Sequence, residues 1–174
     1  MREIIFDTET TGLNPLGGDR MVEIGCVEIV NRVETGRHFH CYFNPERDMP
    51  LEAEMVHGLW TVFLSDKPLF TDKAGDLLDF LEDCPLVAHN ASFDFGFLNT
   101  ELERSGRHPV AISRMVDTLT LARSRHPGPQ HSLHARSVRS GLDRSHRAKH
   151  AAFLAALFHA TVYAQPTGAP ELGP

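Results

Sequence analysis

The sequence predicts an α/β domain with a mixed β-sheet, and three observations support this prediction. The first part of the chain reads as three strands joined by short links, and the middle alternates helical and strand patterns. In addition, 41% of the 174 residues are apolar, which is enough to build one buried core. Short links indicate antiparallel pairing, whereas a strand–helix–strand alternation indicates parallel pairing. A sheet that contains both kinds of pairing follows.

The three early strands are identified by their apolar patterns. Residues 3–9, "EIIFDTE", read as a buried strand, and residues 20–30, "RMVEIGCVEIV", alternate well enough to form a second, longer one. Residues 37–45, "RHFHCYFNP", predict a third. The links between them are too short for the crossover that parallel neighbours need, so we expect an antiparallel meander.

The pattern then changes to helical spacing. Residues 73–84 predict a helix, residues 85–90 ("PLVAHN") a short buried strand, and residues 92–106 an amphipathic helix closed by Gly106. The remaining expectations are a strand near 111–116, short helices near 117–125 and 132–140, a final helix from about 150 to 164, and a disordered Pro/Gly-rich tail over 166–174. One domain would then span residues 1–165.

The composition excludes several classes of protein. No window approaches the roughly 20 apolar residues of a membrane span, and the N-terminus lacks the layout of a signal peptide, so we expect a cytoplasmic protein with no membrane contact. The three cysteines, Cys26, Cys41 and Cys84, are odd in number and show no CxxC spacing. Neither a zinc site nor a disulfide framework is indicated.

The net charge of −6 is unevenly distributed along the chain. Residues 1–100 hold 18 acidic and 7 basic side chains, a net charge of −11, whereas residues 101–150 hold 4 acidic and 10 basic ones, a net charge of +6. One face of the fold could therefore attract phosphate although the whole molecule is acidic. Charge alone is equally consistent with a solvated basic face.

Two acids, Asp7 and Glu9, end the first predicted strand. Residues two apart in a strand share a face, so both carboxylates point the same way while Thr8 points to the other side. Two adjacent carboxylates repel each other unless a cation neutralises them, and hard oxygen ligands favour Mg²⁺ or Mn²⁺ over zinc. Solvated acids at a strand end are the competing interpretation. A phosphatase with an aspartate nucleophile is disfavoured, because the only nearby later acid pair, in residues 75–79, lies in a helical pattern.

Two further residues can serve the same chemistry. Asp94 lies in the first turn of the helix predicted over 92–106, where the helix dipole favours an acid, and it could also face the end of the strand that bears the acid pair. His150 opens the last predicted helix, where the dipole disfavours the imidazolium and leaves a neutral ring able to accept a proton. Each residue taken alone is more often structural.

Together, the segments "FDTETTG", "AHNASFDFGFLN", "SHRAKHAA" and "VHGL" resemble the DEDDh 3′–5′ exonucleases, in particular the proofreading epsilon subunits of bacterial replicative DNA polymerase. The resemblance covers nearly all of residues 1–165. It implies a ribonuclease-H-like fold, with a mixed five-stranded sheet flanked by helices, and two divalent cations, Mg²⁺ or Mn²⁺. In such a site one cation polarises the attacking water and the other stabilises the leaving 3′ oxygen.

The resemblance also implies roles for individual residues. Asp7, Glu9 and Asp94 would hold the metals, and His150 would take the proton from the attacking water. The residues implied to contact the substrate are Thr10, Thr11, Gly12, Leu13, His57, His89, Asn90 and Phe93. The implied partners are single-stranded or frayed DNA 3′ ends and a replicative polymerase subunit, although the C-terminal segment through which full epsilon subunits bind the polymerase is absent.

The family pattern is broken near the end of the chain. Ala155 stands where the family has its last metal-binding aspartate, and His134 and Arg136 replace an acid and an apolar residue. We therefore expect an exonuclease with weakened activity. Two alternatives stay open at this point: a catalytically silent homologue that binds nucleic-acid 3′ ends or a protein partner, and a stand-alone RNA exonuclease that reads the 2′-hydroxyl. The similarity favours a DNA enzyme over the last of these.

Overall fold

The computed structural model describes residues 1–125 and Tyr163. The helices expected over 132–140 and 150–164, the tail over 166–174 and the domain boundary at 165 lie outside these residues. The described elements, in chain order, are β1 (Arg2–Thr10), β2 (Met21–Val30), β3 (Val33–Tyr42), α1 (Leu51–His57), α2 (Thr61–Leu64), α3 (Phe70–Leu81), β4 (Leu86–Ala88), α4 (Ala91–Arg104), the 3₁₀ turn η1 (Ile112–Arg114), β5 (Met115–Asp117) and α5 (Thr118–Arg125).

The sheet has five strands in the order β3-β2-β1-β4-β5. β1 pairs with β2 and β2 with β3 in antiparallel fashion, whereas β4 runs parallel to both β1 and β5. The β2–β3 turn is a tight one, because Asn31 and Arg32 both have positive φ and Val30 pairs directly with Val33. The predicted meander and the mixed five-stranded sheet are both confirmed.

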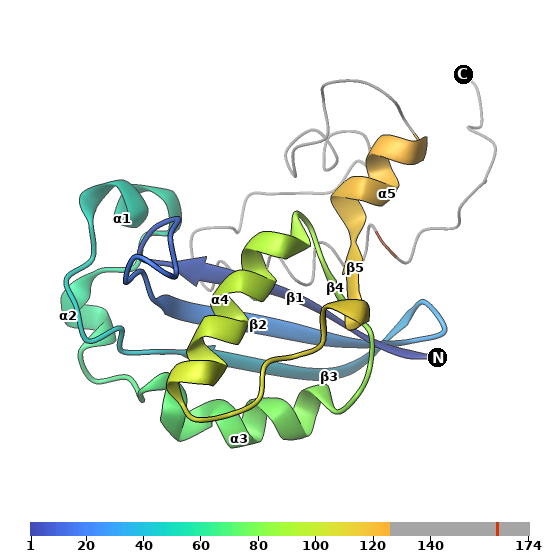
Figure 1. Ribbon diagram of the computed structural model, residues 1–174, viewed down its shortest axis with the longest axis horizontal. Helices are drawn as coiled ribbons and strands as arrows, with labels where there is room; N and C mark the ends of the chain where they lie inside the picture. The colour runs from blue at the N-terminus through green and yellow to red at the C-terminus, as the bar shows by residue number, and fades with distance from the viewer. Residues whose placement is uncertain (126–162, 164–174) are drawn as a thin grey trace.

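Helices α3 and α4 cover one face of this sheet (Figure 1). Ile4 and Phe6 of β1 point to that face and pack with Phe95 and Leu98 of α4 in the main apolar cluster. Phe6 and Phe95 meet edge to face, with ring centroids 5.7 Å apart. Thr8 follows in the same alternation, so it also faces α4.

The other face of the sheet carries the acid pair. Ile5 forms a second apolar cluster there with Val27 of β2 and Val87 of β4. Asp7 and Glu9 continue the alternation of Ile5 along β1, so they lie on the face opposite α3 and α4. The strand periodicity read from the sequence therefore places the two carboxylates together.

Helices α1 and α2 were not predicted from the sequence. Most apolar residues of α1 are exposed, including Leu51, Met55 and Val56, so no buried stripe reveals the helix. α1 ends at Gly58, whose φ of 74° lies in the left-handed region that glycine adopts without strain. The two helices lie near the carboxyl end of β1 (Figure 1). A third, small apolar cluster anchors them, with Val22, Met49, Leu59 and Leu64 as its buried members.

Element boundaries differ from the predicted ones by a few residues. β3 begins at Val33 rather than residue 37, because its first six residues are exposed and give no apolar alternation. α3 runs over Phe70–Leu81 instead of 73–84, since the carboxylate of Asp72 accepts a hydrogen bond from the backbone N–H of Leu69 and starts the helix earlier. In the part of the chain that the structure describes, no helix is long and apolar enough to cross a bilayer.

Candidate active site

The acid pair lies half-buried near the carboxyl end of β1. Asp7 lies opposite Gly25 of β2, which has no side chain to fill the space beside the carboxylate, and Glu9 lies opposite Glu23. Glu23 is fully buried, and its Oε2 is 2.6 Å from Nε2 of His40 on β3. A third carboxylate, which the sequence analysis missed, therefore shares the face of Asp7 and Glu9.

Asp94 meets β1 between these two acids. The pairing of β1 with β4 reaches Ile5, and beyond that point the first turn of α4 lies beside β1. Thr8 donates a hydrogen bond from Oγ1 to Oδ1 of Asp94 at 2.6 Å, and its backbone N–H donates another to the same carboxylate. The structure thus brings Asp94 to the strand of Asp7 and Glu9, although its described contact is with the residue between them.

The electrostatics of Asp94 are unusual for a carboxyl group. Burial raises its pKa to about 7, the hydrogen bonds from Thr8 lower it, and the nearby charge of Asp117 raises it further. Asp117 ends β5, and its Oδ1 accepts hydrogen bonds from the backbone N–H groups of Asn90 and Leu119. A carboxylate that burial and a neighbouring acid both destabilise is one that a cation would stabilise strongly. The sequence analysis missed Asp117, although an acid that ends a strand beside β4 is a usable signal.

His57 fastens α1 to the end of β1. Its Nε2 lies 3.0 Å from the carbonyl oxygen of Thr10, and the backbone N–H of Leu59 donates to Nδ1 at 3.1 Å. These two partners require a neutral ring with its proton on Nε2, and burial lowers the pKa of His57 in agreement. Both ring nitrogens are used within the protein, so the predicted substrate contact of His57 would have to involve the carbon edge of the ring.

The turn after β1 is held by its own side chains. Thr10 donates from Oγ1 to the carbonyl oxygen of Gly12 at 2.6 Å, and Thr11 donates to Oδ1 of Asp19 at 2.9 Å. A Cβ at position 12 would lie 2.4 Å from the Asp19 carboxylate, so this position requires glycine for close packing. Leu13 is 83% exposed and is the member of this predicted group most accessible to a substrate.

The remaining predicted contacts cluster where β4 joins α4. His89 Nδ1 is 3.1 Å from the hydroxyl of Thr118, and Asn90 adopts a left-handed conformation, with φ 62°, as the N-cap of α4. Phe93 is half-buried in the first turn of α4, one residue before Asp94. All three lie beside the carboxyl ends of β4 and β5, where Asp94 and Asp117 also lie.

His150 and Ala155 lie outside the described residues, whereas Tyr163 is described and contacts β1. Its hydroxyl donates to Oε2 of Glu3 at 2.6 Å, and its ring packs with Ile5 in the second apolar cluster. Glu3 and Ile5 precede Asp7 and Glu9 in the same alternation along β1. Tyr163 therefore touches the face of the sheet that carries the acid pair.

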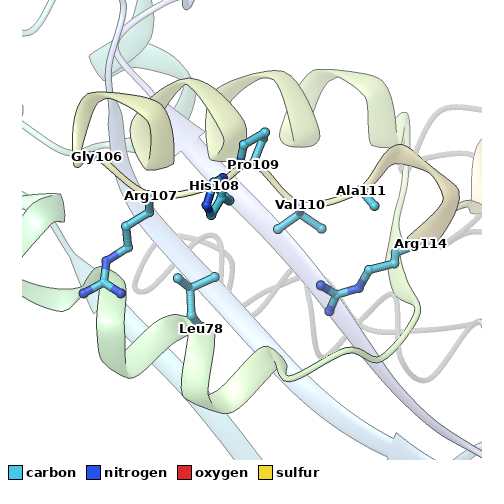
Figure 2. Close-up of a pocket in the computed structure, with 8 residues that line it drawn as sticks. All are labelled: Leu78, Gly106, Arg107, His108, Pro109, Val110, Ala111 and Arg114. Carbon is cyan, nitrogen blue, oxygen red and sulfur yellow. The ribbon is translucent and has the colours of Figure 1, made fainter.

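A pocket of about 480 Å³ lies elsewhere, between α3 and the segment from Gly106 to Arg114. Figure 2 shows Arg107 and Arg114 at its two ends with Leu78 between them. Arg114 is engaged in the structure, because its guanidinium donates to the carbonyl oxygens of Cys84 and Glu82. No acid lines this pocket, so it lacks the groups of a site for divalent cations.

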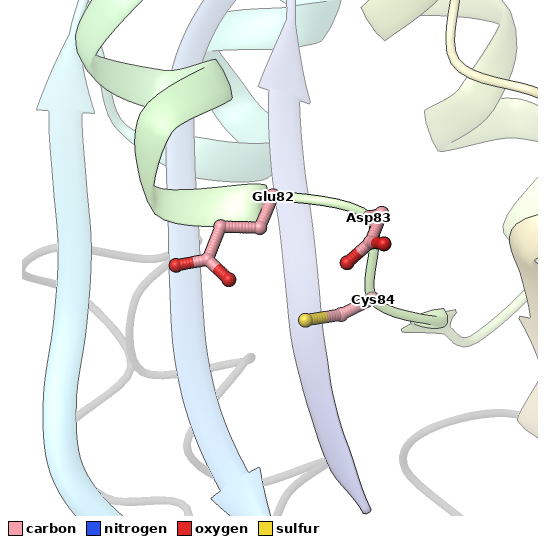
Figure 3. Close-up of side chains that lie close together, drawn as sticks. All are labelled: Glu82, Asp83 and Cys84. Atoms are coloured by element: carbon pink, nitrogen blue, oxygen red, sulfur yellow. The ribbon is translucent and has the colours of Figure 1, made fainter.

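Glu82, Asp83 and Cys84 form a group of possible metal ligands within the described part of the chain, with ligand atoms all within 4.8 Å of one another (Figure 3). The guanidinium of Arg2 contacts two members of this group: Nη1 donates to the sulfur of Cys84 at 2.8 Å and lies 3.8 Å from the Glu82 carboxylate. These contacts lie at the amino end of β1, away from the acid pair. We do not interpret the group as a metal centre.

Comparisons with known proteins identify the family of the chain. The family model described as Exonuclease matches residues 4–162. The DNA polymerase III subunit epsilon of Rickettsia typhi is 50% identical over 171 residues, which cover 97% of this chain and 75% of the relative. These matches extend over the segments that contain Asp7, Glu9 and Asp94.

Solved structures show the same fold at lower identity. The nuclease domain of 3′hExo, a DEDDh family member bound to rAMP, aligns with a TM-score of 0.79 and 17% identity, over 94% of this chain and 90% of that domain. The zinc-bound complex of Escherichia coli ExoI with single-stranded DNA aligns with a TM-score of 0.77 and 18% identity. That alignment covers 92% of this chain but only 38% of the longer ExoI chain. The predicted ribonuclease-H-like fold is confirmed.

Proposed function

Because the chain belongs to the exonuclease family and is similar to bacterial DNA polymerase III epsilon subunits, we propose that it removes nucleotides from DNA 3′ ends by a two-metal mechanism at the end of β1. Membership makes it a 3′–5′ exonuclease of the DEDDh type, a class that uses divalent metal ions. One observation carries the proposed location: the buried carboxyl of Asp94, with its raised pKa, is hydrogen-bonded to β1 between Asp7 and Glu9.

The donor set fits hard divalent cations. Asp7, Glu9 and Asp94 offer only carboxylate oxygens, which Mg²⁺ and Mn²⁺ prefer, and all three are at least half-buried. We propose two ions of this kind, which when bound would activate the attacking water and stabilise the leaving 3′ oxygen. Thr8 would then orient Asp94, because its hydroxyl and its backbone N–H both bind that carboxylate.

We assign proton removal from the attacking water to His150, as the resemblance implies. Tyr163 supports this assignment, because it belongs to the same predicted helix and contacts Glu3 on the face of the acid pair.

The substrate would be a single-stranded or frayed DNA 3′ end. We propose that Thr10, Thr11, Gly12 and Leu13 hold the terminal nucleotide, with exposed Leu13 as the side chain most able to contact a base. The residues proposed to line the path of the strand are His57, His89, Asn90 and Phe93. The polymerase III relatives support DNA as the nucleic acid and a replicative polymerase subunit as a partner.

We also propose that the exonuclease activity is weakened. Within a domain proposed to span residues 1–165, Ala155 takes the position of a metal-binding aspartate, so one ion would be held by fewer carboxylates. The chain would keep enough of the site for slow cleavage through Asp7, Glu9, Asp94 and His150. A catalytically silent protein would keep only binding of 3′ ends.

The test is a single-turnover assay on single-stranded DNA and RNA labelled so that removal of the 3′ nucleotide is seen, with Mg²⁺ and with Mn²⁺. We expect slow release of the 3′ nucleotide from DNA, no release by Asp7→Ala, and retained binding of the oligonucleotide by that variant. A matched control, Asp48→Ala, removes a surface acid far along the chain from the acid pair and should leave the rate unchanged. Absence of cleavage with either metal and either nucleic acid would overturn the proposal in favour of the silent homologue.

A further inference from the structure

Four aromatic rings form a continuous row from β3 to α2. His40 and Tyr42 of β3 meet edge to face with ring centroids 4.8 Å apart, and Tyr42 meets Phe63 of α2 at 5.1 Å. Phe63 in turn contacts Trp60 at 5.5 Å. The rings stabilise one another through these contacts, which hold Trp60 in a defined position at the end of the row.

The row starts on the sheet face of the candidate active site. Tyr42 lies opposite Glu23 of β2, and Glu23 lies opposite Glu9 of β1. Directly opposed residues of neighbouring strands point to the same face of a sheet, so Tyr42 and Glu9 share a face. The same pairing relates His40 to Asp7 across β2. The aromatic row thus extends sideways from the carboxylates across the sheet.

Trp60 ends this row at the surface. Its side chain is 48% exposed, which is high for the only tryptophan of the chain, and it precedes the first residue of α2. His57 anchors the preceding turn to Thr10, one residue after Glu9. The ammonium of Lys67 lies 4.5 Å from the ring centroid of Phe63 and 3.2 Å from the exposed carboxylate of Asp66, which partly balances its charge.

We propose that Trp60 is a stacking platform for an unpaired base of the DNA strand whose 3′ end enters the site at Asp7 and Glu9. This inference rests on the proposed function. Proteins that bind single strands combine exposed aromatic rings, on which bases stack regardless of sequence, with cationic side chains that accompany the backbone. Trp60 supplies the exposed ring, and the Lys67 ammonium, which also pairs with Asp66, lies beside the neighbouring Phe63 ring. Trp60 is a positioning residue in this role, since it would hold the strand and touch no reacting atom.

We favour DNA over a protein partner because the aromatic row leads from Trp60 back toward the strand that carries Glu9. Exposed apolar side chains close to Trp60 in the sequence, those of Met55 and Val62, could also contact a protein. The aromatic row, however, is connected through Tyr42 and Glu23 to the strand that carries Glu9. A base stacked on Trp60 would belong to the same strand as the scissile phosphate, whereas a protein contact needs no such connection.

A single tryptophan makes the first test direct. The full chain, with EDTA present to prevent hydrolysis, is titrated with single-stranded oligothymidylate, and the emission of Trp60 is recorded. The labelled oligonucleotide's anisotropy, measured in parallel, reports binding independently. We expect the emission to be quenched with the same midpoint as the anisotropy change. Binding that leaves the emission unchanged would overturn the platform, as would an emission that follows protein concentration and not DNA.

Variants provide the second test. Trp60→Leu should weaken oligonucleotide binding by roughly 5- to 150-fold, the range for loss of one base–aromatic stack. Trp60→Phe should restore most of the affinity, because phenylalanine keeps a ring on which a base can stack. Ile112→Ala, a change at another exposed apolar residue, in η1, is the matched control and should have no effect. A thermal melt of each variant verifies that it is folded.

Kinetics separate this proposal from the proposed function. In single-turnover cleavage with metal, Trp60→Leu should raise the DNA concentration needed for half-maximal rate and leave the maximal rate nearly unchanged. A mononucleoside phosphodiester has no upstream base, so the variant should hydrolyse it at the wild-type rate. Equal effects on both substrates would overturn the platform while leaving the exonuclease intact. Failure of the wild type to cleave either substrate would overturn the proposed function itself, and the platform with it.

Discussion

Replacing Thr8 by valine tests how the buried carboxyl of Asp94 is controlled. The hydroxyl of Thr8 donates to Oδ1 of Asp94 at 2.6 Å, and Asp94 is only 3% exposed, so water cannot replace the lost donor easily. Valine keeps the branched shape of the side chain and opens no cavity. The substitution therefore removes one hydrogen bond from the ionised carboxylate and little else.

The magnitude follows from the chemistry of that bond. A hydrogen bond to a charged group contributes about 1.5–3 kcal/mol. Because one pKa unit corresponds to about 1.36 kcal/mol, Thr8→Val should raise the pKa of Asp94 by roughly 1 to 2 units above its present value. That value is already raised, to about 7, chiefly by burial.

The sign of the stability change is fixed by linkage. Since the pKa of Asp94 is higher in the folded state, its protonated form contributes stability that is complete below the ordinary value of 3.8 and is lost as the pH rises through about 7. In Thr8→Val the loss should continue to a pH roughly 1 to 2 units higher. At pH 9 the variant should be less stable than the wild type by about 1.5–3 kcal/mol.

The assay is urea unfolding in EDTA between about pH 6.5 and 9.5, above the ordinary pKa of histidine. Asp94→Asn is the control, because an amide does not titrate and should remove this part of the pH dependence. Adding Thr8→Val to Asp94→Asn completes a double-mutant cycle and should produce no further shift of the pH midpoint. The reasoning is refuted if wild type and Thr8→Val lose stability over the same pH interval, or if Asp94→Asn keeps the full pH dependence.

Three further predictions concern the stability of the protein at low pH and the binding of metals. The pKa of His57 is lowered by burial, so its neutral form contributes stability that is lost as the pH falls below about 6.5, when a proton on Nδ1 breaks the bond from Leu59. His57→Gln should flatten this loss of stability at low pH in urea unfolding, and an unchanged loss would contradict the assignment. Calorimetry should find one divalent ion bound more weakly than the other and Mn²⁺ preferred to Mg²⁺, whereas two equally tight Mg²⁺ sites would contradict a missing ligand. Ala155→Asp should accelerate cleavage by roughly 10- to 100-fold or more, and His150→Ala should abolish the gain; no acceleration with either metal would show that position 155 no longer serves the site.

Local patterns in the sequence were sufficient for most of the sheet and its main helices. Alternation along residues 3–9 identified β1 and also put Asp7 and Glu9 on one face, because strand geometry has a period of two whatever the strand pairs with. Helical spacing identified α3 and α4, since both bury an apolar stripe against the sheet. α1 escaped detection because most of its apolar residues are exposed, and it is held by the bond from His57 to Thr10 and by the small apolar cluster around Leu59.

Only the tertiary structure could specify the surroundings of the acid pair. Glu23 and Tyr42 join the row of Glu9 through strand register, a long-range property that no local pattern encodes. The bond from Thr8 to Asp94 likewise joins residues far apart in the chain, and it exists because β4 stops short and lets α4 approach β1. The sequence alone determined which residues are candidates for the chemistry and on which strand face two of them lie. Burial and register, which are properties of the packed sheet, determined the raised pKa of Asp94 and the neighbours of each carboxylate.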